Sequence, residues 1–150
     1  MQIGNSIRFA VPLAAMLLTG ACETPDPDIG SGKQEGTMST FSGLVSTGEP
    51  IRGRSWFVRG RPHGEYCARV GQATRCEGFY PSLPGEPRVT VDFRCDDGRS
   101  GVIKVNRKWR PERKLMVPVS GFAVLSDGKT ATIAFEDVAA YDGRTCEAID

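Results

Sequence analysis

The sequence lacks a hydrophobic segment long enough to cross a membrane as a helix. Its longest apolar run, FAVPLAAMLL at residues 9–18, has ten residues and contains Pro12, whereas a spanning helix needs about 20. No later segment places apolar residues at helical spacing over three turns, which argues against an α-helical domain. The chain is instead rich in turn-forming residues, with 18 glycines and 10 prolines. These observations favour a β-rich fold.

Residue groupings that carry catalysis or hold a metal are also scarce. His63 is the only histidine, and its place between Pro62 and Gly64 is typical of an exposed loop. The sequence has no G-x-S-x-G, HExxH, CxxC or glycine-rich nucleotide motif. Neighbouring acids at 96–97 and 136–137 point apart in an extended chain, so they make a poor acid/base pair. We therefore predict no catalytic residue, no metal site and no cofactor.

Charge of either sign shows no excess. The chain has 19 Lys and Arg against 18 Asp and Glu, a net charge of +1, and 39% of its residues are hydrophobic. This composition excludes a disordered chain and a strongly basic nucleic-acid binder. We expect no nucleic-acid partner.

The first 22 residues have the layout of an export signal. One basic side chain, Arg8, precedes the apolar run, and the small residues Gly20 and Ala21 directly precede Cys22. This ending resembles the lipobox of bacterial lipoproteins, although Thr19 stands where leucine is usual. The resemblance implies that residues 1–21 are a signal peptide that is removed. An ordinary signal peptide, with Cys22 incidental, is the alternative.

What the resemblance implies about location follows from Cys22. This cysteine would be lipidated, palmitate being a typical acyl group, and would anchor the protein to the inner or outer membrane of a bacterial cell envelope. The domain would then face the periplasm or the cell surface. Cysteine parity agrees, because lipidation of Cys22 leaves four of the five cysteines to pair in an oxidising compartment.

The chain after Cys22 divides into a linker and a domain. Residues 22–40 are polar and rich in Pro, Gly, Ser and Thr, so we expect a lipidated, flexible tether with a reach of roughly 25 Å. A loop packed on the domain is the alternative. Residues 41–150 are expected to form a single β domain, since apolar alternation begins there.

Several segments alternate as strands do. RVTVDFRC at 88–95 places Val89, Val91, Phe93 and Cys95 on one face, and TATIAF at 130–135 alternates in the same way. Residues 54–60 and 114–125 are further candidates. The prediction is an all-β fold, a small antiparallel sandwich or barrel of hairpins.

Asp-Gly dipeptides punctuate this pattern. DGRS at 97–100, DGKT at 127–130 and DGRT at 142–145 share one motif. Because the first two lie between alternating segments, they predict two-residue type I′ hairpin turns. Those turns would place Cys95 opposite Ser100 and, in the second hairpin, Phe122 opposite Ile133.

The same reasoning predicts two disulfides. A two-residue turn at Gly71-Gln72 would place Cys67 opposite Cys76, a spacing that a disulfide can bridge. Cys95 would then pair with Cys146 by elimination. This is the favoured one of the three possible connectivities of four cysteines.

Basic and aromatic residues cluster in two stretches, at 51–61 and 104–114. Arginine with tryptophan is typical of binding hot spots and of membrane-surface contacts. The predicted anion- or partner-binding residues come from the second stretch: Arg107, Lys108, Trp109, Arg110, Arg113 and Lys114. A solvated loop that keeps the domain soluble is the alternative.

The stretch CEGFYPSLPGEPRVTVDFRCDDGRSG, residues 76–101, is similar to small exported β domains of proteobacteria without assigned activity, and it implies no functional residue. The sequence favours a non-enzymatic envelope lipoprotein that binds a partner protein or an anionic envelope component. The alternative is a cell-wall or other envelope hydrolase that uses carboxylates brought together by folding, or an accessory or inhibitor of such an enzyme. An inhibitor would need a protruding loop, for which YPSLPGEP at 80–87 is the candidate.

Overall fold

The structure is a computed structural model that describes residues 35–146 and 149. The predicted signal peptide and the predicted lipidation site Cys22 lie outside the described residues. Within this part of the chain, no helix is long and apolar enough to span a membrane.

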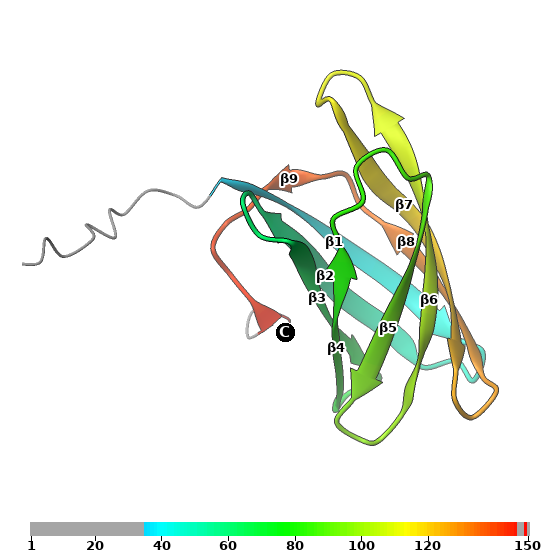
Figure 1. The fold of residues 1–150 in the computed structure, drawn as a ribbon. Coiled ribbons are helices and arrows are strands. Elements are labelled where there is room, and N and C mark those ends of the chain that lie inside the picture. The colour runs from blue at the N-terminus through cyan, green and yellow to red at the C-terminus, as the bar shows by residue number, and fades with distance from the viewer. Residues whose placement is uncertain (1–34, 147–148, 150) are drawn as a thin grey trace, which may run out of the picture. The chain divides into compact units, whose positions relative to one another are not determined.

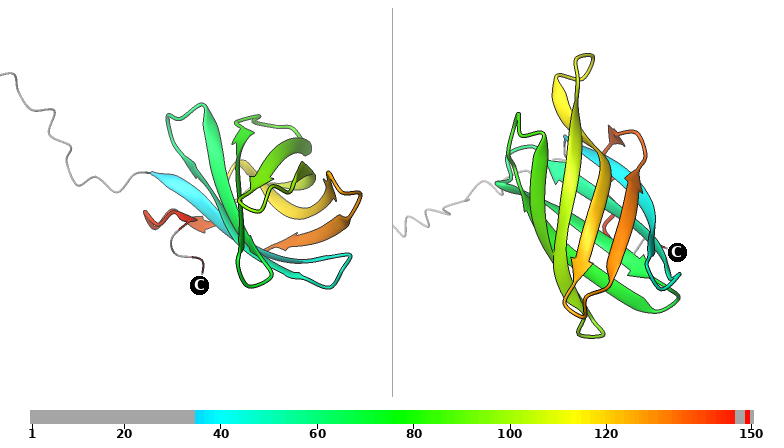
Figure 2. Two further views of the ribbon diagram at one scale, coloured as in Figure 1. Left: turned by 90° about the horizontal axis from the view of Figure 1, so that it is seen from below. Right: turned by 90° about the vertical axis from the view of Figure 1, so that its right-hand side faces the viewer.

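The described residues form an antiparallel β-barrel (Figures 1 and 2). The first strand pairs with the second along one edge and with the eighth along the other, so the sheet closes on itself. A short ninth strand, β9 (Ala139–Ala140), continues the pairing along β1. The eight strands of the barrel are β1 (Gly36–Val45), β2 (Pro50–Val58), β3 (His63–Val70), β4 (Thr74–Pro81), β5 (Arg88–Cys95), β6 (Ser100–Arg110), β7 (Leu115–Leu125) and β8 (Thr130–Phe135).

The all-β prediction is therefore confirmed, and the architecture is the barrel rather than the sandwich. The domain begins earlier than expected, because β1 starts at Gly36. Residues 36–40, expected to belong to the tether, are paired with β2 instead. The Gly, Ser and Thr residues at 36–40 made this segment look like a linker in the sequence. In the structure it is the start of β1, whose Met38, Ser39 and Phe41 pack against other parts of the barrel.

Inward-facing residues follow the predicted alternation. Val89, Val91 and Phe93 of β5 are buried inside the barrel, as are Ala131 and Ile133 of β8. The intervening residues of β5 face solvent. This period of two is the geometry of a strand with one buried face.

The hairpin registers differ from the prediction by one residue. Gly98 has a φ of 86°, whereas Asp97 does not have a positive φ, so the turn is not type I′, which needs both. It is a longer loop ending in a left-handed glycine, and it pairs Arg94, not Cys95, with Ser100. The β7–β8 hairpin has the same shift around Gly128.

This shift decides which β7 residues enter the core. Gly121 lies opposite Ile133, the place predicted for Phe122. Phe122 consequently points outward and is 45% exposed. Moving a pairing by one residue exchanges the two faces of a strand.

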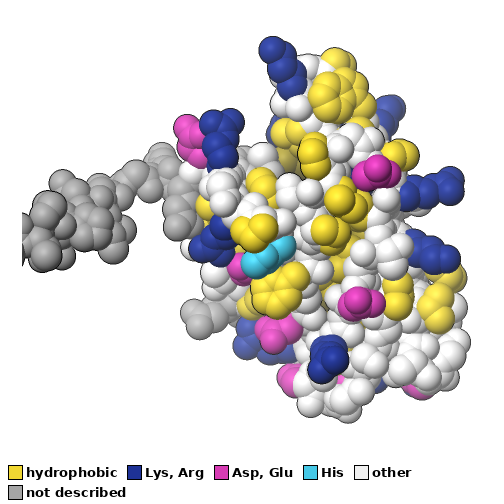
Figure 3. All heavy atoms as spheres, in the orientation of Figure 1, with side chains coloured by type: hydrophobic (Ala, Val, Ile, Leu, Met, Phe, Trp, Pro, Cys, Tyr) yellow, Lys and Arg dark blue, Asp and Glu magenta, His cyan; other side chains and the backbone are white. Residues whose placement is uncertain are grey.

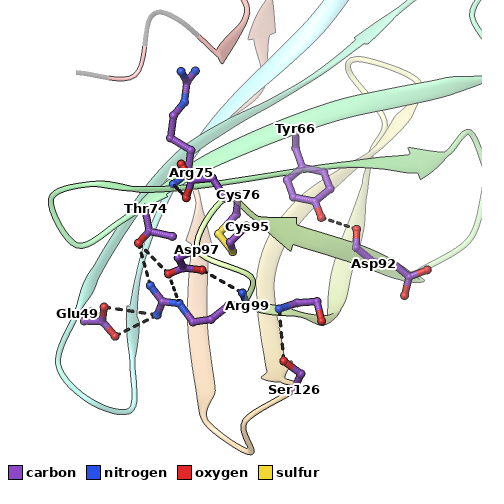
Figure 4. Close-up of a disulfide and its surroundings, with 12 residues drawn as sticks. Glu49, Tyr66, Thr74, Arg75, Cys76, Asp92, Cys95, Asp97, Arg99 and Ser126 are labelled. Carbon is purple, nitrogen blue, oxygen red and sulfur yellow. Dashed lines mark hydrogen bonds and ion pairs between the residues drawn. A yellow bond between two sulfur atoms is a disulfide. The ribbon is translucent and has the colours of Figure 1, made fainter.

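One end of the barrel is closed by a polar network around Arg99 (Figure 4). The Arg99 guanidinium donates to Asp97 at 2.7 Å, to Glu49 at 3.2 Å and to Thr74 at 3.2 Å. The hydrogen bond from the Arg99 backbone N–H is the main reason that the pKa of Asp97 lies below its usual value. The network connects the turns after β1, β3 and β5.

The wall between β4 and β5 is only partly paired. The two strands are in register only at Cys76–Cys95 and Glu77–Arg94. Beyond these pairs the Tyr66 hydroxyl of β3 donates a hydrogen bond of 2.6 Å to the Asp92 carbonyl of β5. It passes Gly78 of β4, where a Cβ would overlap the tyrosine hydroxyl. Tyr66 thus links β3 to β5, a strand with which β3 does not pair.

We expect Tyr66→Phe to lower the free energy of unfolding by about 1 kcal/mol, because the partly buried hydrogen bond to the Asp92 carbonyl would be lost. Tyr80→Phe is the matched control, since no hydrogen bond from its hydroxyl is present among the described residues. Urea unfolding of both variants measures the difference. Equal losses in the two variants would contradict the bridging role of Tyr66.

Candidate ligand-binding cavity

The other end of the barrel holds a cavity of about 520 Å³. It opens at the end where the β2–β3, β4–β5 and β6–β7 loops lie. Its walls are mainly apolar and include Phe57, Tyr66, Tyr80, Val89, Val91, Val105, Met116, Pro118, Phe135 and Val138. Eight-stranded barrels are wide enough to hold one small ligand, and this volume lies within the usual range for such sites.

A layer of four side chains forms the floor of the cavity. Phe41, Tyr66, Ile103 and Ile133 line both the large cavity and a void of about 40 Å³ in the packed half of the barrel. The two halves therefore differ in packing: one is nearly filled by side chains, and the other contains the cavity. The filled half also carries the disulfide.

Two tyrosines in the wall were not singled out by the sequence analysis. Tyr66 lies opposite Gly78, and Tyr80 lies opposite Gly64. Each ring covers its partner glycine, where a Cβ would overlap the ring. The sequence did contain a pattern that could have indicated this arrangement, a Gly-x-Tyr at 64–66 and another at 78–80. When two such strands pair antiparallel, each tyrosine lies across from the glycine of the other strand.

Both phenols are held in the neutral form. Burial raises the pKa of Tyr80 well above its usual value, and burial does the same for the pKa of Tyr66, with the nearby Asp92 adding to it. The tyrosine oxygens therefore offer neutral polar groups in the wall, and no charge.

Arg107 lies at the mouth of the cavity, where its guanidinium forms hydrogen bonds with backbone carbonyls. Its guanidinium donates to the carbonyl of Leu83 at 2.7 Å and to that of Met116 at 3.2 Å. Partial burial lowers the pKa of Arg107, although it remains far above neutrality. These bonds hold the β4–β5 loop, residues 82–87, against β7. Residues 80–85, part of the stretch considered as the protruding loop of an inhibitor, line the cavity mouth.

The remaining predicted basic residues lie on the β6–β7 hairpin (Figure 1). Arg113 donates to the Val138 carbonyl and lies 3.6 Å from the Asp137 carboxylate. Its guanidinium, like that of Arg107, therefore already has partners within the protein. Lys108 is exposed, and Arg110 is partly buried. Trp109, which is 49% exposed, and Lys114 line the mouth of the cavity. The six residues therefore do not form one solvated face.

Positive charge nevertheless dominates the cavity mouth. The charged lining residues are Arg59, Arg107, Lys114 and Glu35. Glu35 is paired with Arg59 at 2.7 Å in an exposed ion pair. Lys114 forms no ion pair with another described residue. Figure 3 shows hydrophobic side chains gathered on the face below the hairpin, with Lys and Arg at its tip.

The structure corrects the predicted disulfides. Cys76 of β4 is joined to Cys95 of β5 (Figure 4). Cys67 and Cys146 are not bonded to a partner. The β3–β4 loop has three residues, so Cys67 lies opposite Glu77 and Cys76 lies opposite Ala68. Cys67 and Cys76 therefore face opposite sides of the wall, and neither Cys67–Cys76 nor Cys95–Cys146 forms.

Within the described part of the chain, few side chains are placed for metal binding or for acid/base catalysis. No group of three His, Cys, Asp or Glu residues is placed to hold a metal within residues 35–146 and 149. His63 lies against Phe79 in an edge-to-face contact, with ring centroids 5.0 Å apart. Among the residues that the structure describes, Glu35 is the one carboxylic acid in the cavity lining.

The fold and the cavity together define a closed antiparallel β-barrel with an internal, one-ended cavity. No family model matches the sequence, and no curated protein matches it. Among solved structures, a de novo designed fluorescence-activating β-barrel shares 16% identity over 66% of this chain and 89% of its own, with a TM-score of 0.44. A redesigned β-barrel bound to DFHBI shares 12% identity over 67% of this chain and 95% of its own, with a TM-score of 0.46. Neither likeness identifies a ligand.

Proposed function

We propose that this protein is a non-enzymatic binding protein of the bacterial cell envelope, whose barrel takes up an anionic amphiphile. Lipidated Cys22 would hold the domain at the membrane, and the apolar part of the amphiphile would enter the cavity. Its acidic group would remain at the mouth, beside Lys114. The anionic envelope component expected from the sequence is thus a single lipid-like molecule rather than a surface polymer.

The observation that carries the proposal is the polarity of the cavity from floor to mouth. The inner part is lined by Val91, Val105 and Phe135, and unpaired positive charge lies at the opening on Lys114. Burial of an acyl chain contributes about 0.8 kcal/mol per methylene group. An exposed charge at the mouth adds up to about 1 kcal/mol and discriminates against cations.

The lining also favours binding over hydrolysis. Glycoside hydrolysis by the usual route needs two carboxyl groups about 5–10 Å apart, and the lining supplies only Glu35. This side chain is exposed and paired with Arg59. The hydrolase alternative therefore has less support from the cavity than the binding proposal has.

Titration with dodecanoate tests the proposal directly. Trp109 lines the mouth and is half exposed, whereas Trp56 is buried elsewhere, so we expect a blue shift of tryptophan fluorescence that Trp109→Phe removes. Dodecyltrimethylammonium, which has the same chain and the opposite charge, should bind more weakly. Equal binding of the two surfactant ions would contradict the role of the basic mouth.

Two substitutions assign the site by calorimetry with the same probe. Val105→Phe places a ring in the cavity, and we expect at least a tenfold loss of affinity, about 1.4 kcal/mol. Val124→Phe is its control, because Val124 faces outward. Lys114→Gln should cost up to about fivefold, and Lys104→Gln, on the outer face of β6, should cost nothing. Unchanged binding by Val105→Phe would remove the cavity as the site.

A further inference from the structure

The C-terminal segment lies against the outside of the barrel and makes a second, smaller apolar cluster. The buried members are Trp56, Val58 and Cys67, from β2 and β3, and the side chains packed on them are Met38, Tyr141, Cys146 and Ile149. This cluster is separate from the core inside the barrel. Its existence explains why β2 is buried on both faces.

Three contacts fix this segment to β1 and β2 independently of the cysteines. The Tyr141 ring stacks on Trp56 with centroids 6.4 Å apart, and the Tyr141 backbone N–H donates to the Gly36 carbonyl. The Asp142 carboxylate accepts from the Arg54 guanidinium at 3.1 Å. Arg54 is buried, whereas Asp142 is partly accessible to solvent.

The two cysteines that are not bonded meet in this cluster. Cys146 packs against the buried group of side chains that includes Cys67. Arg54 lies directly across from Cys67 in the β2–β3 pairing, so the Asp142 contact brings the segment to this point of the sheet. Cys67 is buried, whereas Cys146 is partly exposed.

We propose that Cys67 and Cys146 form a second disulfide, which locks the C-terminal segment onto the outer face of β2 and β3. The oxidant is a disulfide donor met in an oxidising compartment, by thiol–disulfide exchange. The bond is distinct from Cys76–Cys95, which lies inside the barrel. It does not depend on ligand binding in the cavity.

The difference in exposure sets the order of the two exchange steps. Cys146 loses its proton and attacks the donor disulfide, which forms a mixed disulfide and releases one donor thiolate. Cys67 then loses its proton and attacks the Cys146 sulfur, and the second donor thiolate leaves. The protein loses two protons and two electrons, and the donor disulfide gains them. Burial raises the pKa of the Cys67 thiol, so the second step is expected to be slow.

A peptide map without reduction, on the full chain isolated from an oxidising compartment, tests the bond. We expect one cross-linked peptide pair joining Cys67 to Cys146 and a second joining Cys76 to Cys95. A thiol-alkylating reagent added before unfolding should label neither Cys67 nor Cys146. Alkylation of both, or a link from Cys67 to any cysteine other than Cys146, would overturn the proposal.

Exposure of the protein to oxidised glutathione tests the order of the steps. Cys67→Ser should accumulate glutathione on Cys146, whereas Cys146→Ser should leave the buried Cys67 unmodified. The intact bond should raise the melting temperature by roughly 10 °C relative to the double variant Cys67→Ser with Cys146→Ser. Rapid glutathionylation of Cys67 in Cys146→Ser would contradict the assigned order, and an unchanged melting temperature would show that the segment is not locked.

Discussion

Replacement of Phe41 by alanine will lower the free energy of unfolding by about 3–5 kcal/mol. Phe41 is 5% exposed and belongs to the layer that separates the cavity from the packed half of the barrel. Its ring contacts Phe135 with centroids 5.2 Å apart and covers Gly53 of β2, where a Cβ would overlap it. Removal of the ring would join the cavity to the void beneath it, and the lining would lose its packing on both sides.

Urea denaturation measures the loss, with Phe122→Ala as the control. Phe122 has the same chemistry but points outward from β7, so its removal should cost less than about 1 kcal/mol. A loss of that small size for Phe41→Ala would show that the floor layer does not support the barrel. A deeper cavity should also favour longer chains, so the variant's affinity for hexadecanoate relative to dodecanoate should rise.

The second large effect is expected from the disulfide inside the barrel. The bridge joins residues 19 positions apart, and the entropy of closing such a loop predicts a loss of about 3 kcal/mol when both Cys76 and Cys95 are replaced by serine. The bridge also occupies one of the two registered pairs between β4 and β5. Its loss should therefore weaken the part of the wall that has the fewest backbone hydrogen bonds.

Denaturation and amide hydrogen exchange check this prediction together. The double variant should unfold at lower urea than the parent, and its fastest new exchange should be in β4 and β5. The parent protein treated with a reducing agent is the control, and it should match the variant. If exchange rises evenly over all strands, or the urea midpoint does not move, the bridge does not hold the β4–β5 wall.

Strand faces were predictable because alternation is a local property of the chain. Val89, Val91 and Phe93 were assigned to one face from the sequence and are buried together. The positions of the turns at Gly98 and Gly128 were also correct. The number of residues in each turn was not, because it depends on whether one or two residues adopt a positive φ.

An error of one residue in loop length also changed the predicted faces of the cysteines. With one more residue in the β3–β4 loop, Cys67 moved to the outer face and Cys76 to the inner one. The cysteine pairing derived from the shorter turn was wrong for this reason. For the predicted anion- or partner-binding residues, the contacts of Arg107 and Arg113 could not be read from the sequence: both donate to backbone carbonyls that distant parts of the chain bring near.

The sequence by itself determined the class of fold, the inward and outward residues of β5 and β8, and the places where the chain turns. Each of these depends on neighbours within a few residues. Only the tertiary structure decided the closure of β1 on β8, the Cys76–Cys95 bridge, the meeting of Cys67 with Cys146, and the cavity. These depend on contacts between distant segments, whose register is set by turn geometry and by which inward side chains are too small to fill the barrel.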